Sequence, residues 1–369
     1  MKRIAAICLA LGAALLLSGC EGNMFSSHRD MEHLRPIQTI GLDRTEGGVI
    51  LSVSSGIGPD GGAPLVMKTS AAGIEPAISR LQDYSPEDEL FYAHVRYILI
   101  GETMADQGVM PLLDWAERSP AMRMDTVMLA VKGNAYAAVT GASGAKTDIT
   151  ERLASLEREE LVRGLHVYTL REAASSLLER GSALCMAVEQ RPSEGTVYTE
   201  EEVTDAVIPA GYAVLQNGAL ATYLTEEETL GAALLEKGVT GTHIKLDGCV
   251  LELFGASASA SGVWEEGRLS GIRIDCTLQA GVLERKEGGA EDVERLQSAL
   301  SAAVESALSS AVSLSQRLGC DYLDLRGAVM KTAPTGAADA DGDWETMFPS
   351  LPVTVKAAGE IQRSYDLSN

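Results

Sequence analysis

Hydrophobic positions along the chain follow two periods, which predict alternating strands and helices. Residues 37–42 and 49–54 alternate apolar and polar side chains around Gly47-Gly48, as two strands joined by a tight turn do. Residues 73–84 place apolar side chains at helical spacing, with Pro76 in the first turn. The same reasoning predicts helices at 102–107, 111–118, 148–163, 169–180, 225–235 and 290–318, and strands at 92–100, 126–131, 183–188, 206–215, 219–224, 242–254, 269–283 and 351–355.

Short polar motifs mark the ends of several elements. Thr169 with Glu172, and Thr225 with Glu228, have the spacing of a helix capping box. Asn217-Gly218 predicts a two-residue hairpin turn. A Ser/Ala/Gly-rich segment after residue 254 predicts a turn between two long β segments. This mixture of hairpins and helices is typical of an α+β protein.

The chain is long enough for two or three domains. An acidic, proline-containing stretch at 190–205 predicts the main boundary. We expect three mixed α/β domains with antiparallel hairpins, and a long helix in the last of them. The predicted divisions are a signal peptide at 1–19, a polar tether at 20–36, an N-terminal domain at 37–145, a middle domain with its connection at 146–205, and a C-terminal domain at 206–369.

The N-terminus has the pattern of a secreted lipoprotein. Lys2 and Arg3 precede an apolar run at 4–17, which is too short for the roughly 20 residues that span a bilayer. Leu17-Ser-Gly-Cys20 then matches a bacterial lipobox, so we expect Cys20 to carry a diacylglycerol that holds the chain on the membrane. The alternative is an ordinary signal peptide that contains a cysteine.

Charge and cysteine content restrict the partners. The formal charge is −22, and loss of Lys2 and Arg3 with the signal makes it −24. Such a surface repels nucleic acid and anionic headgroups, so we expect no nucleic-acid partner. Cys185, Cys249, Cys276 and Cys320 lack paired spacing and are predicted to be buried thiols, with a Cys249–Cys276 bridge as the alternative.

Motifs for catalysis or cofactor binding are missing from the sequence. It contains no HExxH, no paired zinc ligands and no GxSxG. GASGAKT at 141–147 has alanine where a phosphate-binding loop needs glycine before lysine. The acids at 339, 341 and 343 lack the glycine and glutamate of a calcium loop, so a solvated loop is favoured. We expect no cofactor, no metal and no enzymatic activity.

Several motifs, in their order and spacing, resemble one known family. The sequence has IGLD at 40–43, YAHVRYILIGE at 92–102, LLDW at 112–115 and LTEEETLG at 224–231. After the long helix it has GCD at 319–321, Trp344, Phe348 and VTV at 353–355. This pattern resembles the C-subunit lipoproteins of bacterial spore germinant receptors, the Ger(x)C family. The family's tryptophan-containing motif after the cysteine is missing here.

The resemblance implies a lipid-anchored, non-enzymatic subunit at the outer face of the spore inner membrane. It implies a complex with an integral-membrane, transporter-like subunit and with a larger subunit. Within this picture, the candidate interface or structural residues are His94, Arg96, Arg118 and Trp344. The first alternative is a solute-binding lipoprotein that delivers a ligand to a transporter. The second is a cell-wall hydrolase, which the sequence does not support.

Overall fold

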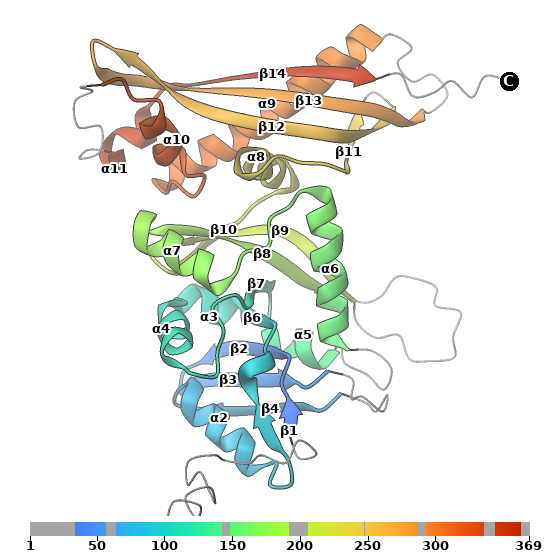
Figure 1. The fold of residues 1–369 in the computed structure, drawn as a ribbon, viewed down its shortest axis with the longest axis vertical. Helices are drawn as coiled ribbons and strands as arrows, with labels where there is room; N and C mark the ends of the chain where they lie inside the picture. The colour runs from blue at the N-terminus through green and yellow to red at the C-terminus, as the bar shows by residue number, and fades with distance from the viewer. Residues whose placement is uncertain are drawn as a thin grey trace, which may run out of the picture.

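An eight-stranded and a four-stranded β-sheet, with the helices packed on them, make up most of the described chain (Figure 1). The computed structural model describes residues 34–56, 64–141, 148–191, 206–246, 248–285, 293–335 and 344–362. The expected signal peptide, Cys20 and most of the tether lie outside the described residues. So do residues 142–147 of the GASGAKT segment, the acidic stretch at 192–205, and the acids at 339, 341 and 343.

The larger sheet has eight strands in the order β10-β9-β8-β7-β6-β2-β3-β4. Its four central strands, β2, β6, β7 and β8, run parallel, and antiparallel hairpins extend both ends. The strands are β2 (Thr39–Thr45), β3 (Gly48–Ser54), β4 (Val66–Ala71), β6 (Tyr97–Gly101), β7 (Val127–Lys132), β8 (Ser182–Arg191), β9 (Ala206–Gln216) and β10 (Ala219–Tyr223). A two-stranded ladder pairs β1 (Leu34–Pro36) with β5 (Glu89–Phe91).

Helices cover both faces of this sheet, because its central strands are apolar on both sides. On β6, the side chains of Ile98 and Ile100 lie on one face of the sheet, and those of Tyr97 and Leu99 lie on the other. The first face is covered by α2 (Ile74–Asp83), α3 (Glu102–Gln107), α4 (Met110–Arg118) and α7 (Leu170–Arg180). The second face is covered by α5 (Ala135–Gly141) and α6 (Ile149–Arg163).

A buried carboxylate holds α5 against the larger sheet. Asp43 accepts hydrogen bonds from the main-chain N–H groups of Ala135 and Tyr136, both at 2.8 Å. Burial raises the pKa of Asp43, although these hydrogen bonds oppose the shift. A Cβ at Gly101 would overlap the Asp43 carboxylate, so the small residue at 101 makes room for the acid at the end of the IGLD motif.

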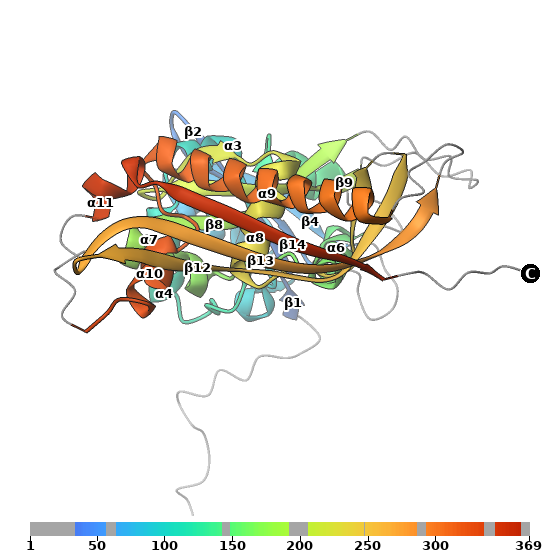
Figure 2. The same cartoon turned by 90° about the horizontal axis from the view of Figure 1, so that it is seen from above.

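The smaller sheet has four strands in the order β11-β12-β13-β14. They are β11 (Thr242–Leu246), β12 (Cys249–Glu265), β13 (Arg268–Arg285) and β14 (Val353–Gln362). The long helix α9 (Val293–Leu318) runs along one face beside β14, as Figure 2 shows. Short helices follow at α10 (Leu325–Lys331), α11 (Trp344–Met347) and η4 (Phe348–Ser350).

Helix α8 (Glu226–Glu236) joins the two sheets. It packs against α9 and also contacts β12 and β9. One apolar cluster therefore continues from the second face of the larger sheet, through Tyr212 and Leu224, to Leu251 and Ile274 of the smaller sheet. The α+β class expected from the sequence is confirmed by this mixture of helices and mixed sheets.

Some local predictions are confirmed and others are wrong. The single β segment expected at 242–254 is two antiparallel strands, β11 and β12, because the chain turns between Leu246 and Cys249. Both capping boxes form, and Asn217-Gly218 turns with positive φ at both residues. Tyr92–His94 is a 3₁₀ turn rather than the start of a strand, because the Tyr92 carbonyl accepts the Val95 N–H. The Ser/Ala/Gly segment is part of β12, and its turn lies later, at Glu266-Gly267, because β13 pairs with the whole segment.

The larger sheet takes strands from all three ordered domains expected from the sequence, since β8 lies within 146–205 and β9 begins at residue 206. Whether 37–145, 146–205 and 206–369 fold as separate units stays a prediction. In the described residues, no helix combines the length and the apolar character needed to cross a membrane.

Candidate functional site

The two sheets meet where the loop after α6 passes the end of α8. Gly164 ends α6 with φ +84°, and a Cβ there would lie 2.7 Å from the Val239 Cα. Gly238 has φ +80°, and a Cβ there would overlap the carbonyl oxygen of Ala256. Val239 and Ala256 exchange two hydrogen bonds, of 2.7 and 2.9 Å. Glycines at these two positions therefore allow three main-chain segments to touch.

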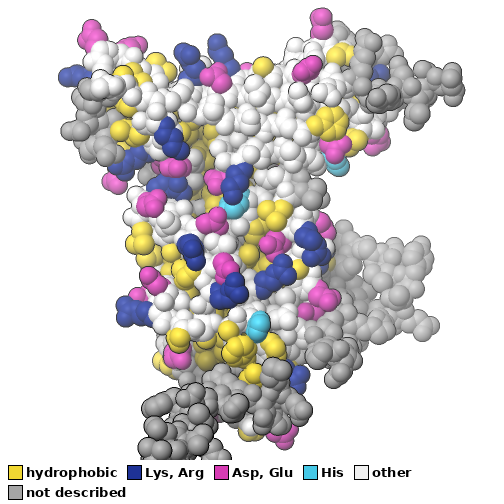
Figure 3. Space-filling view, viewed as in Figure 1, with side chains coloured by type: hydrophobic (Ala, Val, Ile, Leu, Met, Phe, Trp, Pro, Cys, Tyr) yellow, Lys and Arg dark blue, Asp and Glu magenta, His cyan; other side chains and the backbone are white. Residues whose placement is uncertain are grey.

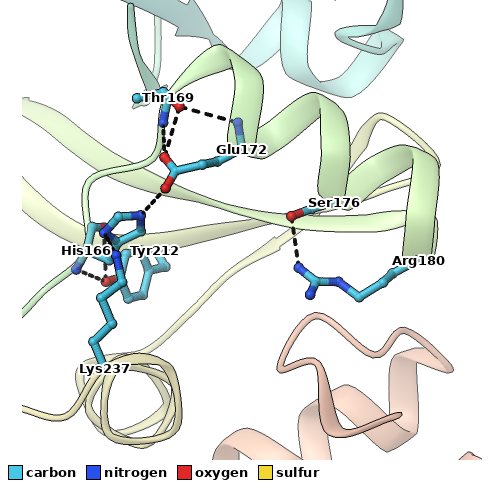
Figure 4. A network of polar contacts seen from close by, with 7 residues as sticks. All are labelled: His166, Thr169, Glu172, Ser176, Arg180, Tyr212 and Lys237. Atoms are coloured by element: carbon cyan, nitrogen blue, oxygen red, sulfur yellow. Dashed lines mark hydrogen bonds and ion pairs between the residues drawn. The ribbon is translucent and has the colours of Figure 1, made fainter. Parts of the chain in front are cut away.

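A polar cluster closes this contact, and we call it the junction cluster: His166, Thr169, Glu172, Tyr212 and Lys237 (Figure 4). His166 Nε2 lies 2.8 Å from Glu172 Oε1, and Lys237 Nζ lies 2.9 Å from His166 Nδ1. A lysine ammonium only donates, so Nδ1 accepts and Nε2–H donates to the carboxylate. A neutral His166 thus connects an acid on α7 with a base at the end of α8.

The other cluster members fix His166 from its main chain. Its N–H donates to the Tyr212 hydroxyl at 2.8 Å, and that hydroxyl donates to the His166 carbonyl at 3.2 Å. The Tyr168 ring packs edge-on against the imidazole, with centroids 4.5 Å apart. Side chains from β9, α7 and the end of α8 therefore hold one loop in place.

Glu172 is ionised and its two carboxylate oxygens have separate partners. Oε2 accepts from the Thr169 N–H at 2.8 Å and from its hydroxyl at 2.9 Å, while Oε1 faces His166. Burial raises the pKa of Glu172, but the hydrogen bonds from Thr169 and His166 outweigh it and hold that pKa below its ordinary value. Burial raises the pKa values of Tyr168 and Tyr212, so both phenols stay neutral.

Two grooves flank the junction cluster. The first has a volume of about 760 Å³ and is lined by His166, Lys237 and the open face of the smaller sheet at Ser257 and Thr277. The second has a volume of about 610 Å³ and lies between α7, α10 and β12. Arg180 Nη1 and Asp324 Oδ2 pair across it at 3.3 Å. Figure 3 shows basic and acidic side chains intermixed on this face of the molecule.

The junction cluster connects the loop after α6 with α7 and with the end of α8. In the described ranges, no group of three His, Cys, Asp or Glu side chains is placed to hold a metal ion. Each charged cluster member already has a protein partner. A displacement of the α8 end would act on the loop through Lys237, and on α7 through His166 and Glu172.

The residues singled out from the sequence lie apart from this cluster and from one another. His94 is exposed on the 3₁₀ turn, where its ring packs against Phe91. Arg96 pairs with Glu157 at 3.2 Å, and Arg118 pairs with Asp114 at 2.7 Å, both near the surface. Trp344 is only 5% exposed and stacks on Phe348 in the core. Their roles stay predictions.

The four described cysteines are buried and free. Cys276 is opposite Ala258 in the β ladder and Cys249 is opposite Arg285, so the alternative of a Cys249–Cys276 bridge is wrong. Sequence reasoning found Thr169 and Glu172 as a capping box. It missed His166 and Lys237, which are 71 positions apart and share no motif.

Comparison with solved structures identifies the class of fold. The chain is similar to the structure titled "Crystal Structure of the GerBC protein", with a TM-score of 0.55 and 14% sequence identity. The match covers 87% of this chain and 96% of that one. No curated protein matches the chain by sequence.

Two family models match in sequence order. The spore germination protein N-terminal domain matches residues 27–189, and the spore germination B3/GerAC-like C-terminal model matches residues 210–365. The chain belongs to the family of C-subunits of spore germinant receptors. Members of this family act in spore germination as part of a membrane-associated receptor complex with other subunits. The family is not known as one of enzymes.

Proposed function

We propose that this protein is a lipid-anchored, non-enzymatic subunit of a nutrient germinant receptor, and that it acts by scaffolding and by coupling its membrane partners. The observation that carries the proposal is the match of both family models, in order, along most of the chain. The proposed anchor is a diacylglycerol on Cys20, for which the lipobox is the support. The site of action is the outer face of the spore inner membrane.

The junction cluster supports the coupling part of the proposal. His166 and Glu172 belong to the region matched by the N-terminal model, and Tyr212 and Lys237 to the region matched by the C-terminal model. Contacts between the two regions are hydrogen-bonded and closely packed, so a force applied to one is passed to the other. The proposed partners are an integral-membrane, transporter-like subunit and a larger receptor subunit.

Spores that carry Cys20→Ala test the anchor. We expect the protein's membrane-bound fraction and nutrient-triggered germination to fall together while the folded protein persists, because the acyl chains supply the membrane affinity. Cys8→Ala is the matched control, since the expected cleavage removes that cysteine with the signal. Normal germination and normal membrane fractionation in Cys20→Ala spores would contradict the anchoring proposal. Normal germination of the deletion strain would contradict the receptor role.

The alternative of a solute-binding lipoprotein predicts two doubly wound lobes of βαβ units. The described chain instead has one eight-stranded mixed sheet and one four-stranded sheet that contains a long hairpin. A thermal-shift screen against amino acids and sugars separates the two functions. A solute-binding protein would gain stability as RT ln(1+[L]/Kd), and the scaffold would show no shift.

A further inference from the structure

One stretch of strand edge in the smaller sheet has no neighbouring strand, although α10 packs close to β12. Beside β12, the row of partners begins with β11 at Cys249 to Leu253 and continues with the bridge between Val239 and Ala256. It resumes at Gly262, whose N–H donates to the Thr332 hydroxyl at 2.9 Å. Between these points, residues 258–260 border the groove of about 610 Å³.

The ladder register shows which main-chain groups face that groove. The Ala256 N–H donates to the Val239 carbonyl, and the Ala256 carbonyl accepts from the Val239 N–H. Both main-chain groups of Ala256 therefore point away from β13, and Ala256 and Leu278 form a non-hydrogen-bonded pair. Pairing alternates along an antiparallel ladder, so the main-chain groups of Ala258 and Ala260 also point away from β13. Within the described part of the chain, no hydrogen bond reaches these groups from the outer side.

The opposite edge of the same sheet, on β14, has hydrogen-bond partners for main-chain N–H groups. On β14, the Ala357 N–H donates to Glu305 Oε1 at 2.9 Å, and the Gly359 N–H donates to Ser301 Oγ at 3.1 Å. Both acceptors are side chains of α9, and they block the addition of another strand there. Proteins usually protect exposed strand edges in such ways, so an unprotected edge inside a groove is unusual.

We propose that an extended segment of a partner subunit adds to the edge of β12 beside Ala258 and Ala260. Donors and acceptors that repeat every second residue, about 7 Å apart, match another polypeptide in the extended conformation. Such a segment would continue the row that β11 and Val239 begin. This inference rests on the proposed receptor function, because it takes the partner to be another receptor subunit.

Side chains around the groove define the partner further. Ala258 and Ala260 are small, so they leave the approach to their main chain open. At the Thr332 end lies the exposed ammonium of Lys331, which pairs with no acid among the described residues. Arg180 is already paired with Asp324. We therefore infer that the segment carries an acidic side chain at its Lys331 end.

The test uses the full-length protein and overlapping synthetic peptides that span the water-exposed segments of the two partner subunits. We expect one peptide to bind and to slow amide hydrogen exchange at Ala258 and Ala260. Ala258→Pro removes one outward N–H without touching the β13 ladder, and should weaken binding about tenfold or more. Ser261→Ala, which keeps every main-chain group, is the matched control.

A second measurement on the unaltered protein guards against misfolding of the proline variant. N-methylation of the bound peptide at alternate amides should abolish binding in one register and leave it intact in the other, because only every second N–H faces β12. Binding that is insensitive to both changes would overturn the inference.

If no peptide binds, hydrogen exchange in the assembled receptor gives the answer. Unchanged exchange at Ala258 and Ala260 while the chain co-purifies with its partners would overturn the inference and leave the receptor function intact. Slowed exchange at both amides in the assembled receptor would support it. Failure of the chain to co-purify with either partner would contradict the proposed function itself.

Discussion

Gly164 offers a direct test of how firmly the two sheets are joined. A Cβ at this position would lie 2.7 Å from the Cα of Val239 and 2.9 Å from the Gly238 carbonyl oxygen. Both are main-chain atoms, so Gly164→Ala makes room only by displacing the segment at 238–240. We expect the variant to break the hydrogen bonds between Val239 and Ala256 and to loosen the junction cluster.

The expected cost follows from two contributions. Alanine in the left-handed conformation that Gly164 adopts costs roughly 1 kcal/mol. The two hydrogen bonds between Val239 and Ala256 contribute about 1 kcal/mol each. We therefore expect Gly164→Ala to lower the free energy of unfolding by about 3 kcal/mol in a urea titration. Hydrogen exchange at Val239 and Ala256 should quicken in parallel.

Gly319→Ala is the matched control. Gly319 has φ +59°, and a Cβ there meets no atom within 4 Å, so only the conformational cost of about 1 kcal/mol remains. Equal destabilisation by the two variants, with unchanged exchange at Val239, would refute the reasoning. The sheets would then adjust to each other without cost, and position could not be transmitted through this contact.

Three further predictions concern single groups. Gly101→Ala should lower the free energy of unfolding by about 3 kcal/mol in a urea titration, because the Cβ displaces the Asp43 carboxylate from two main-chain donors; Gly47→Ala, which meets no atom within 4 Å, should change it little. The lowered pKa of Glu172 contributes stability above pH 4.5, and this stability is lost as the pH falls through the pKa of the folded state. The free energy of unfolding should therefore fall less steeply with decreasing pH in Glu172→Gln than in the unaltered protein. Identical slopes would contradict this. Burial raises the pKa of Cys185 to about 12, so a thiol reagent should label it in urea but not in the folded protein, as peptide mass spectrometry can check.

Local sequence signals predicted the elements whose cause is local. The capping boxes at Thr169 and Thr225 and the turn at Asn217-Gly218 depend on residues three or fewer positions apart, and all formed. The segment at 255–262 did not follow its local signal. Glycine, alanine and serine have weak strand preference, yet β13 supplies a complete ladder that overrides it.

The junction cluster could not be predicted because its parts come from distant places in the sequence. His166 lies between the helices predicted at 148–163 and 169–180, and Lys237 lies after the helix predicted at 225–235. Their contact depends on how α8 packs on α9 and β12, which no motif encodes. The unpaired edge at Ala258 could not be predicted either. The sequence indicated a turn at this segment, and a turn has no strand edge that could be left unpaired.

The strand order also sets a sequence of events for a chain that emerges N-terminus first. All eight strands of the larger sheet lie before residue 224, so this sheet can complete its ladder while later residues are still emerging. The smaller sheet is completed only when β14 has emerged. β14 pairs with β13 but follows it in the sequence, with α9 lying between the two strands. Until then, the edge of β13 at residues 272–281 has no partner strand. We therefore expect folding in two stages, with the second stage more exposed to aggregation and more dependent on chaperones.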